Sequence, residues 1–217
     1  MILIRTLSYL GLLTLVMIGP QSWGHPTSYE GGFAFMGEMN PNHQKASFIY
    51  SPKYWLGVGI VGLRAPGSES LVAAQLGWLV KRWNRPAAQG NIYFVGGVGY
   101  AEQTALSNLS RKGLIYRYGA QADYETRRFF SFAKYTEHRF FNKNQVLTQH
   151  LELAVGIAPY LAKYNELNSW LILKFELTDL LSEVSWVPTI KFFYKNFLWE
   201  IGQSFEGHLH LNFMLRF

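Results

Sequence analysis

The feature that most limits how this chain can fold is an alternation of apolar and polar residues with a period of two. It is clearest from Gly207 to Phe217, where one side of the pattern carries Leu209, Leu211, Phe213, Leu215 and Phe217. The other side carries His208, His210, Asn212, Met214 and Arg216. Successive side chains of a β-strand point to opposite faces, so this segment is predicted to be a strand with one apolar face and one largely polar face.

The same pattern recurs earlier in the chain and indicates a barrel in a membrane. From Leu114 to Tyr124, the polar residues Arg117, Gln121 and Asp123 share one face. Burying an arginine and an aspartate in the core of a soluble sheet would be costly, whereas a hydrated lumen accepts them. Alternating segments of about ten residues separated by turn residues are typical of a transmembrane β-barrel.

We therefore expect an all-β fold: a closed, antiparallel, up-and-down transmembrane barrel of about twelve strands. The strands are predicted near residues 28–38, 44–51, 54–64, 70–83, 90–103, 112–125, 128–139, 146–160, 167–177, 184–195, 197–204 and 207–217. Because 128–139 and 167–177 alternate poorly, ten strands are an open alternative. A soluble secreted β-sandwich is a second alternative, since its strands can alternate in the same way.

Residues 1–24 have the pattern of a secretory signal peptide. Arg5 gives the positive start, Leu7 to Ile18 is apolar, and small residues precede the expected cleavage site after Gly24. The alternative is a membrane anchor, but this apolar run is shorter than the roughly 20 residues that span a bilayer as a helix. We expect residues 25–217 to form the barrel domain.

The composition of the chain is consistent with an exported protein and limits the kinds of partner that it can bind. Only 16% of residues are charged, against about 25% in an ordinary soluble domain, so we expect something other than water to cover part of the surface. The chain has no cysteine, which excludes disulfides, thiolate metal sites and a cysteine nucleophile. The net charge of +6 comes from scattered lysines and arginines, and we expect no nucleic-acid partner.

The last strand resembles the C-terminal strand of bacterial outer-membrane β-barrel proteins, which commonly ends in an aromatic residue. Phe213, Leu215 and Phe217 carry this resemblance. It implies residence in the outer membrane of a Gram-negative bacterium, in contact with its lipid and lipopolysaccharide. It also implies delivery by periplasmic chaperones and recognition by the outer-membrane assembly machinery. No activity follows from it.

Any binding chemistry is expected among the polar side chains that line the lumen. These are Arg117, Gln121, Asp123, His150, Glu152, Glu200, His208, His210, Asn212 and Arg216. His208 and His210 share a predicted face and could bind a metal with Glu200 as a neighbour, but the interpretation we adopt is that they hydrate the lumen. We predict no metal and no cofactor.

A non-enzymatic role is favoured over catalysis. The chain has neither a Gly-x-Ser-x-Gly nucleophile elbow nor a His-Glu-x-x-His zinc motif. A lipid-modifying hydrolase, acting on lipid A or phospholipid, is the enzymatic alternative, with His150 or His208 as its base. The favoured hypothesis is a narrow channel or a structural and interaction protein. Twelve-stranded channels for acidic oligosaccharides are similar in length, but no shared motif assigns a substrate.

Overall fold

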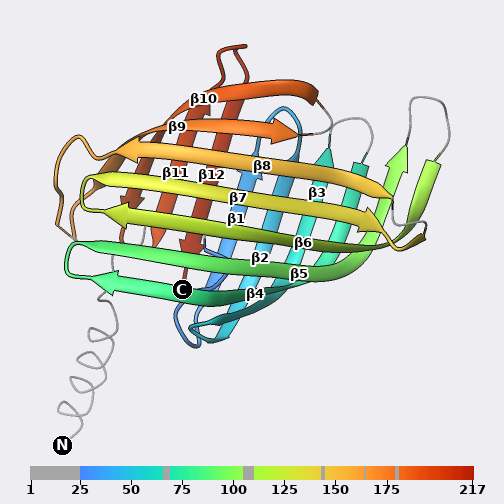
Figure 1. Ribbon diagram of the computed structural model, residues 1–217, viewed down its shortest axis with the longest axis horizontal. Coiled ribbons are helices and arrows are strands. Elements are labelled where there is room, and N and C mark those ends of the chain that lie inside the picture. Colours follow the sequence, from blue (N-terminus) through green and yellow to red (C-terminus); the bar gives the residue numbers. More distant parts are fainter. Residues whose placement is uncertain (1–24, 66–68, 105–109, 143–144, 164, 179–180) are drawn as a thin grey trace, which may run out of the picture.

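The computed structural model describes residues 25–65, 69–104, 110–142, 145–163, 165–178 and 181–217 (Figure 1). The expected signal peptide lies outside the described residues. The strands are β1 (Phe33–Met39), β2 (Gln44–Lys53), β3 (Leu56–Ala65), β4 (Glu69–Arg85), β5 (Ala88–Thr104), β6 (Ser110–Thr126), β7 (Phe129–Phe140), β8 (Val146–Ile157), β9 (Asn168–Thr178), β10 (Leu181–Tyr194), β11 (Phe197–Gln203) and β12 (Leu209–Arg216). No helix among the described residues has both the length and the apolar character needed to cross a membrane.

The twelve strands form one closed barrel in which each strand pairs antiparallel with its neighbours in sequence. β1 and β12 close the ring, with Ala34 opposite Arg216 and Met39 opposite Leu211. The predicted fold class is confirmed, and closure leaves no free sheet edges of the kind a β-sandwich has. The first strand begins at Phe33 and not near residue 28, because an exposed turn at Glu30 and Gly31 separates it from His25–Ser28, which lie inside the barrel.

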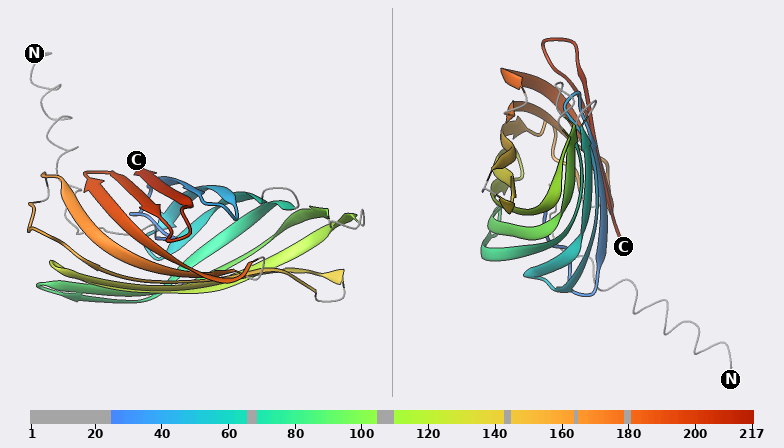
Figure 2. Two further views of the ribbon diagram at one scale, coloured as in Figure 1. Left: turned by 90° about the horizontal axis from the view of Figure 1, so that it is seen from above. Right: turned by 90° about the vertical axis from the view of Figure 1, so that its right-hand side faces the viewer.

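The barrel is flattened (Figure 2). The layer that contains β5, β6 and β7 faces a layer that contains β2, β3, β11 and β12, and the strands of the two layers cross (Figure 1). The rings of His43, in the β1–β2 turn, and His150, on β8, have centroids 5.9 Å apart. These elements lie on opposite sides of the ring of strands. Side chains from the two layers therefore meet inside the barrel.

Alternation places apolar side chains outside and most charged side chains inside. Val72, Val98 and Leu114 are 64%, 57% and 65% exposed on the outer surface. Lys174, Lys191 and Glu200 are buried in the interior at 5%, 1% and 1%. An apolar outer surface of this extent would aggregate in water, whereas lipid covers it favourably.

The interior is not polar throughout. We call the end of the barrel where the backbones of Phe33 and Phe217 are hydrogen bonded the terminal end, and the opposite end the loop end. Buried apolar side chains form a cluster toward each end of the barrel. The cluster toward the terminal end consists of Phe130, Phe132, Ala154, Ala158, Trp170 and Ile172. The cluster toward the loop end consists of Val61, Leu71, Ala73, Ala101, Ile115, Phe140 and Leu147.

The segment from His25 to Ser28 lies inside the terminal end. His25, Thr27 and Ser28 are all less than 10% exposed, and the Ser28 amide donates a 2.6 Å hydrogen bond to Ser51 Oγ. Pro26 rests on the paired glycines Gly57 and Gly77, whose missing side chains leave room for its carbonyl group. This segment narrows the lumen at that end.

Candidate functional site

An ion-pair network runs around the inside of the barrel between the two apolar clusters. Lys45 Nζ lies 2.6 Å from Glu38 Oε2, and Lys134 Nζ lies 3.2 Å from Glu152 Oε2. Lys174 lies 3.6 Å from Glu152 and 2.7 Å from Glu200. We use the name lumen network for these residues: Glu38, Lys45, Lys134, Glu152, Lys174 and Glu200.

The pair between Lys174 and Glu200 joins two strands that are not direct neighbours. Lys174 is on β9 and Glu200 is on β11, so their side chains meet across the inner face of β10. Glu200 Oε2 also accepts a 3.2 Å hydrogen bond from Asn212 Nδ2. Buried charges that are paired and hydrogen bonded in this way hold each other in fixed positions, because leaving either one alone would be costly.

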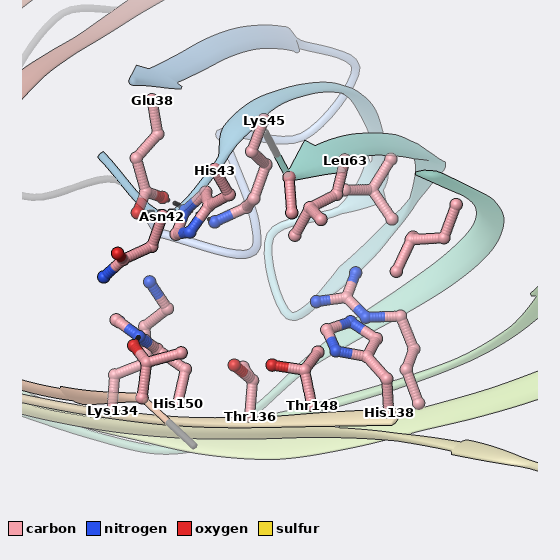
Figure 3. A pocket seen from close by; sticks show the side chains of 15 residues that line it. Glu38, Asn42, His43, Lys45, Leu63, Lys134, Thr136, His138, Thr148 and His150 are labelled. Atoms are coloured by element: carbon pink, nitrogen blue, oxygen red, sulfur yellow. Dashed lines mark hydrogen bonds and ion pairs between the residues drawn. The ribbon is translucent and has the colours of Figure 1, made fainter. Parts of the chain in front are cut away.

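A basic pocket lies on the loop-end side of the network (Figure 3). Figure 3 shows His138, Thr136 and Thr148 directed into the pocket from one wall, with His43 and Lys45 on the wall opposite. It has a cavity of about 30 Å³, and the side chains that line it include three permanent cations, three histidines and one acid. These residues are Lys45, Lys134, Arg117, His43, His138, His150 and Glu38.

Two further cavities continue from this pocket through the lumen. The second, of about 100 Å³, shares Lys45, Arg117, Lys134 and other side chains with the first, and Pro26 lines it at the terminal end. The third, of about 20 Å³, shares Glu38 with both and Glu152 with the second. The three cavities therefore follow one another around the lumen network.

Most of the predicted lumen residues are inside the barrel, and the structure separates them into groups. Arg117, Gln121, Asp123, Glu152, Glu200, His210 and Arg216 are each less than 10% exposed. Asn91 Nδ2 donates a 2.6 Å hydrogen bond to Asp123 Oδ1, and His25 Nδ1 lies 3.5 Å from Asp123 Oδ2. Asp123 therefore belongs to the terminal end, whereas Glu152 and Glu200 belong to the lumen network.

His208 and His210 do not form a pair in the structure. His208 is exposed in the turn before β12, where its amide bonds to Ser204 Oγ. His210 lies inside the barrel, 3.5 Å from Glu176 on β9, and Glu200 is held by Lys174. Within the described part of the chain, no group of three or more side chains is arranged to hold a metal ion.

His150 has a hydrogen bond to a hydroxyl but no access to lipid. Its Nδ1 lies 3.0 Å from Thr178 Oγ1, and its Nε2 lies 4.0 Å from Glu152 Oε2. All three side chains face the lumen between the two layers of strands. A lipid acyl chain on the outer surface is separated from them by the barrel wall, so the geometry does not favour the hydrolase alternative.

The sequence interpretation missed five residues of this site: His43, Lys134, His138, Lys174 and Glu176. Most of them are on β7 and β9, whose inner faces begin with aromatic and aliphatic residues before they become polar. The apolar residues of the outer face carry a signal that could have found them. On β9, Leu171, Leu173 and Leu177 point outward and alternate with the inward Lys174 and Glu176; the pattern is regular if Trp170 is assigned to the inner face.

The closed antiparallel barrel, its apolar exterior and its charged interior define the general class of outer-membrane β-barrel proteins. No family model and no curated protein matches the chain. Among solved structures, the chain is similar to one described as "KdgM porin in complex with disordered oligogalacturonate". The TM-score is 0.44 at 12% identity, and the match covers 86% of this chain and 98% of that chain.

Proposed function

We propose that the protein is a non-enzymatic outer-membrane channel that admits water and small ions. The observation that carries the proposal is the series of three cavities that share lining residues, charged side chains among them. They extend from Pro26 at the terminal end to Asn42 in the β1–β2 turn at the loop end. Charged side chains of the lumen network line all three cavities, which supports passage of ions over a purely structural role.

The size of the cavities sets the class of solute. The widest is about 100 Å³, which is room for a few water molecules and not for a folded or branched solute. Each cavity is lined by side chains that form ion pairs with one another. A solute that passes must therefore replace some of its hydrating water molecules with contacts to Lys and Glu side chains. We therefore expect a small unit conductance with no passage of oligosaccharides.

Planar-bilayer recording of refolded protein tests this proposal. The expected result is discrete steps of small conductance in potassium chloride. Thr136 lines the first two cavities, and Thr136→Trp is expected to remove most of the current by filling them. The control is Val98→Trp, at a position that is 57% exposed on the outer surface. Absence of opening events in refolded wild type refutes the channel and leaves a structural or interaction role.

We also propose that residues 1–24 direct export, that cleavage follows Gly24, and that the assembly machinery recognises Phe213, Leu215 and Phe217. The apolar run from Leu7 to Ile18 and the alternation of β12 support these steps. Mass spectrometry of protein purified from outer membranes tests the cleavage, with His25 expected as the first residue. Retention of the leader at that location contradicts it.

A further inference from the structure

Arg117 on β6 is a buried cation with no acidic partner. It is 7% exposed, and among the described residues its hydrogen-bond acceptor is the neutral amide oxygen of Gln75. Its Nε has no hydrogen-bond partner, and none of the ion pairs found in the described part of the chain includes it. The other cations of the basic pocket differ, because Lys45 is paired with Glu38 and Lys134 with Glu152.

A second side-chain nitrogen without a partner among the described residues, His138 Nδ1, lies on the strand beside this guanidinium. His138 lies directly opposite Arg117 on the neighbouring strand, so the two side chains leave the sheet on the same face. His138 is 5% exposed, and its Nδ1 has no partner. Both residues line the basic pocket. Gly97 packs against both residues of the contact between Arg117 and Gln75: a Cβ there would clash with the Ala74 carbonyl oxygen and would lie 3.1 Å from Arg117 Cγ and 3.2 Å from Gln75 Cα.

A bound anion would compensate the buried charge of Arg117. A guanidinium cannot lose its proton in a protein, and a buried charge without a partner carries a large desolvation cost. An arginine and an imidazole can together supply N–H donors to one negative centre. The cavity of about 30 Å³ limits that centre to a single small ion.

We propose that Arg117 and His138 form a binding site for a small inorganic anion of halide size inside the lumen. The anion occupies the basic pocket and accepts hydrogen bonds from the Arg117 guanidinium and from a His138 ring nitrogen. This site deepens the proposed channel function, since it would give the lumen a preferred ion at one point on its path. The proposed anion site rests on the buried charge of Arg117, and it does not require that the anion crosses the barrel.

Bromide, which diffracts anomalously, is a direct probe of the site. Crystals of the mature barrel grown in sodium bromide are expected to show an anomalous peak within hydrogen-bond distance of the Arg117 guanidinium. Crystals of Arg117→Gln are expected to lose that peak. Arg64→Gln is the matched control, because Arg64 is exposed on the outer side of β3 and its loss removes the same charge without entering the lumen. The peak should remain in this variant.

The outcomes separate this site from the channel itself. A wild-type crystal without a bromide peak at Arg117, or a peak that persists in Arg117→Gln, overturns the anion site. Reversal potentials in a salt gradient add a second readout: the wild-type preference for chloride over potassium should be lost in Arg117→Gln and kept in Arg64→Gln. Bromide bound in a barrel that never conducts supports the site and refutes only the channel.

Discussion

The fit of Pro26 against Gly57 and Gly77 gives a sharp test of the segment that enters the barrel. In Gly77→Ala, the new Cβ would lie 2.5 Å from the Pro26 carbonyl oxygen and 2.7 Å from Pro26 Cβ. Ordinary contacts begin near 3.4 Å, so the segment must withdraw by nearly 1 Å. The obstacle is backbone, which cannot rotate away as a long side chain could.

The magnitude follows from two costs. Overpacking a filled interior costs about 1–3 kcal/mol. Withdrawal of the segment also stretches the 2.6 Å bond from the Ser28 amide to Ser51 Oγ, and a lost hydrogen bond costs about 0.5–1.5 kcal/mol. We therefore expect Gly77→Ala to lower the free energy of unfolding by about 3 kcal/mol, near the middle of the summed ranges.

Urea unfolding in phospholipid bilayers measures this change as a shift in midpoint at constant slope. Gly62→Ala is the control, because no heavy atom lies within 4 Å of its added Cβ. That variant should be neutral, or more stable by about 0.4–1 kcal/mol through the entropy of the unfolded chain. Hydrogen exchange at the Ser28 amide should accelerate in Gly77→Ala alone. Equal midpoints for the two variants, with the Ser28 amide still protected, would refute the docked segment.

Three further predictions concern the charges and the surface. Glu200→Gln leaves the buried Lys174 without its nearest acid and should destabilise the barrel by about 3–5 kcal/mol in urea unfolding. Glu30→Gln, in an ion pair whose side chains are more than half exposed, should cost less than about 1 kcal/mol, and a similar cost at both sites would contradict a buried network. Val98→Arg should cost up to about 2–4 kcal/mol in lipid, least if Val98 lies near the membrane interface. Phe217→Ala should reduce the heat-modifiable barrel found in outer membranes, and unchanged amounts would remove this residue from the assembly signal.

The sequence predicts the barrel well because lipid and lumen impose opposite demands on successive residues. On β12, four apolar residues alternate with His210, Asn212, Met214 and Arg216, and the structure places the four on the outside as expected. The prediction is weaker where the pattern shifts by one residue. A bulge between Leu79 and Lys81 breaks the register of β4, so Lys81 is exposed and Arg82 contacts Asn91 inside the barrel.

The candidate site was less predictable, because it depends on contacts between strands that are distant in sequence. The inward position of Arg117 follows from alternation within β6. Its lack of an acidic partner depends on β4, which offers Gln75 at that point, and on β7, which offers His138. The position of Pro26 in the lumen is harder still to predict from sequence. It depends on Gly57 and Gly77, which are 20 residues apart in the chain and become neighbours only when β3 pairs with β4.

Flattening of the barrel is what turns twelve strands into a narrow lumen. In a round barrel of this strand number, side chains on opposite walls would be separated by water. Here the rings of His43 and His150, on opposite sides of the barrel, have centroids 5.9 Å apart. Widening the path at this level therefore requires the two layers of strands to move apart. Under the proposed function, the contact between His43 and His150 restricts the channel near the loop end, and the segment at Pro26 adds a second restriction at the terminal end.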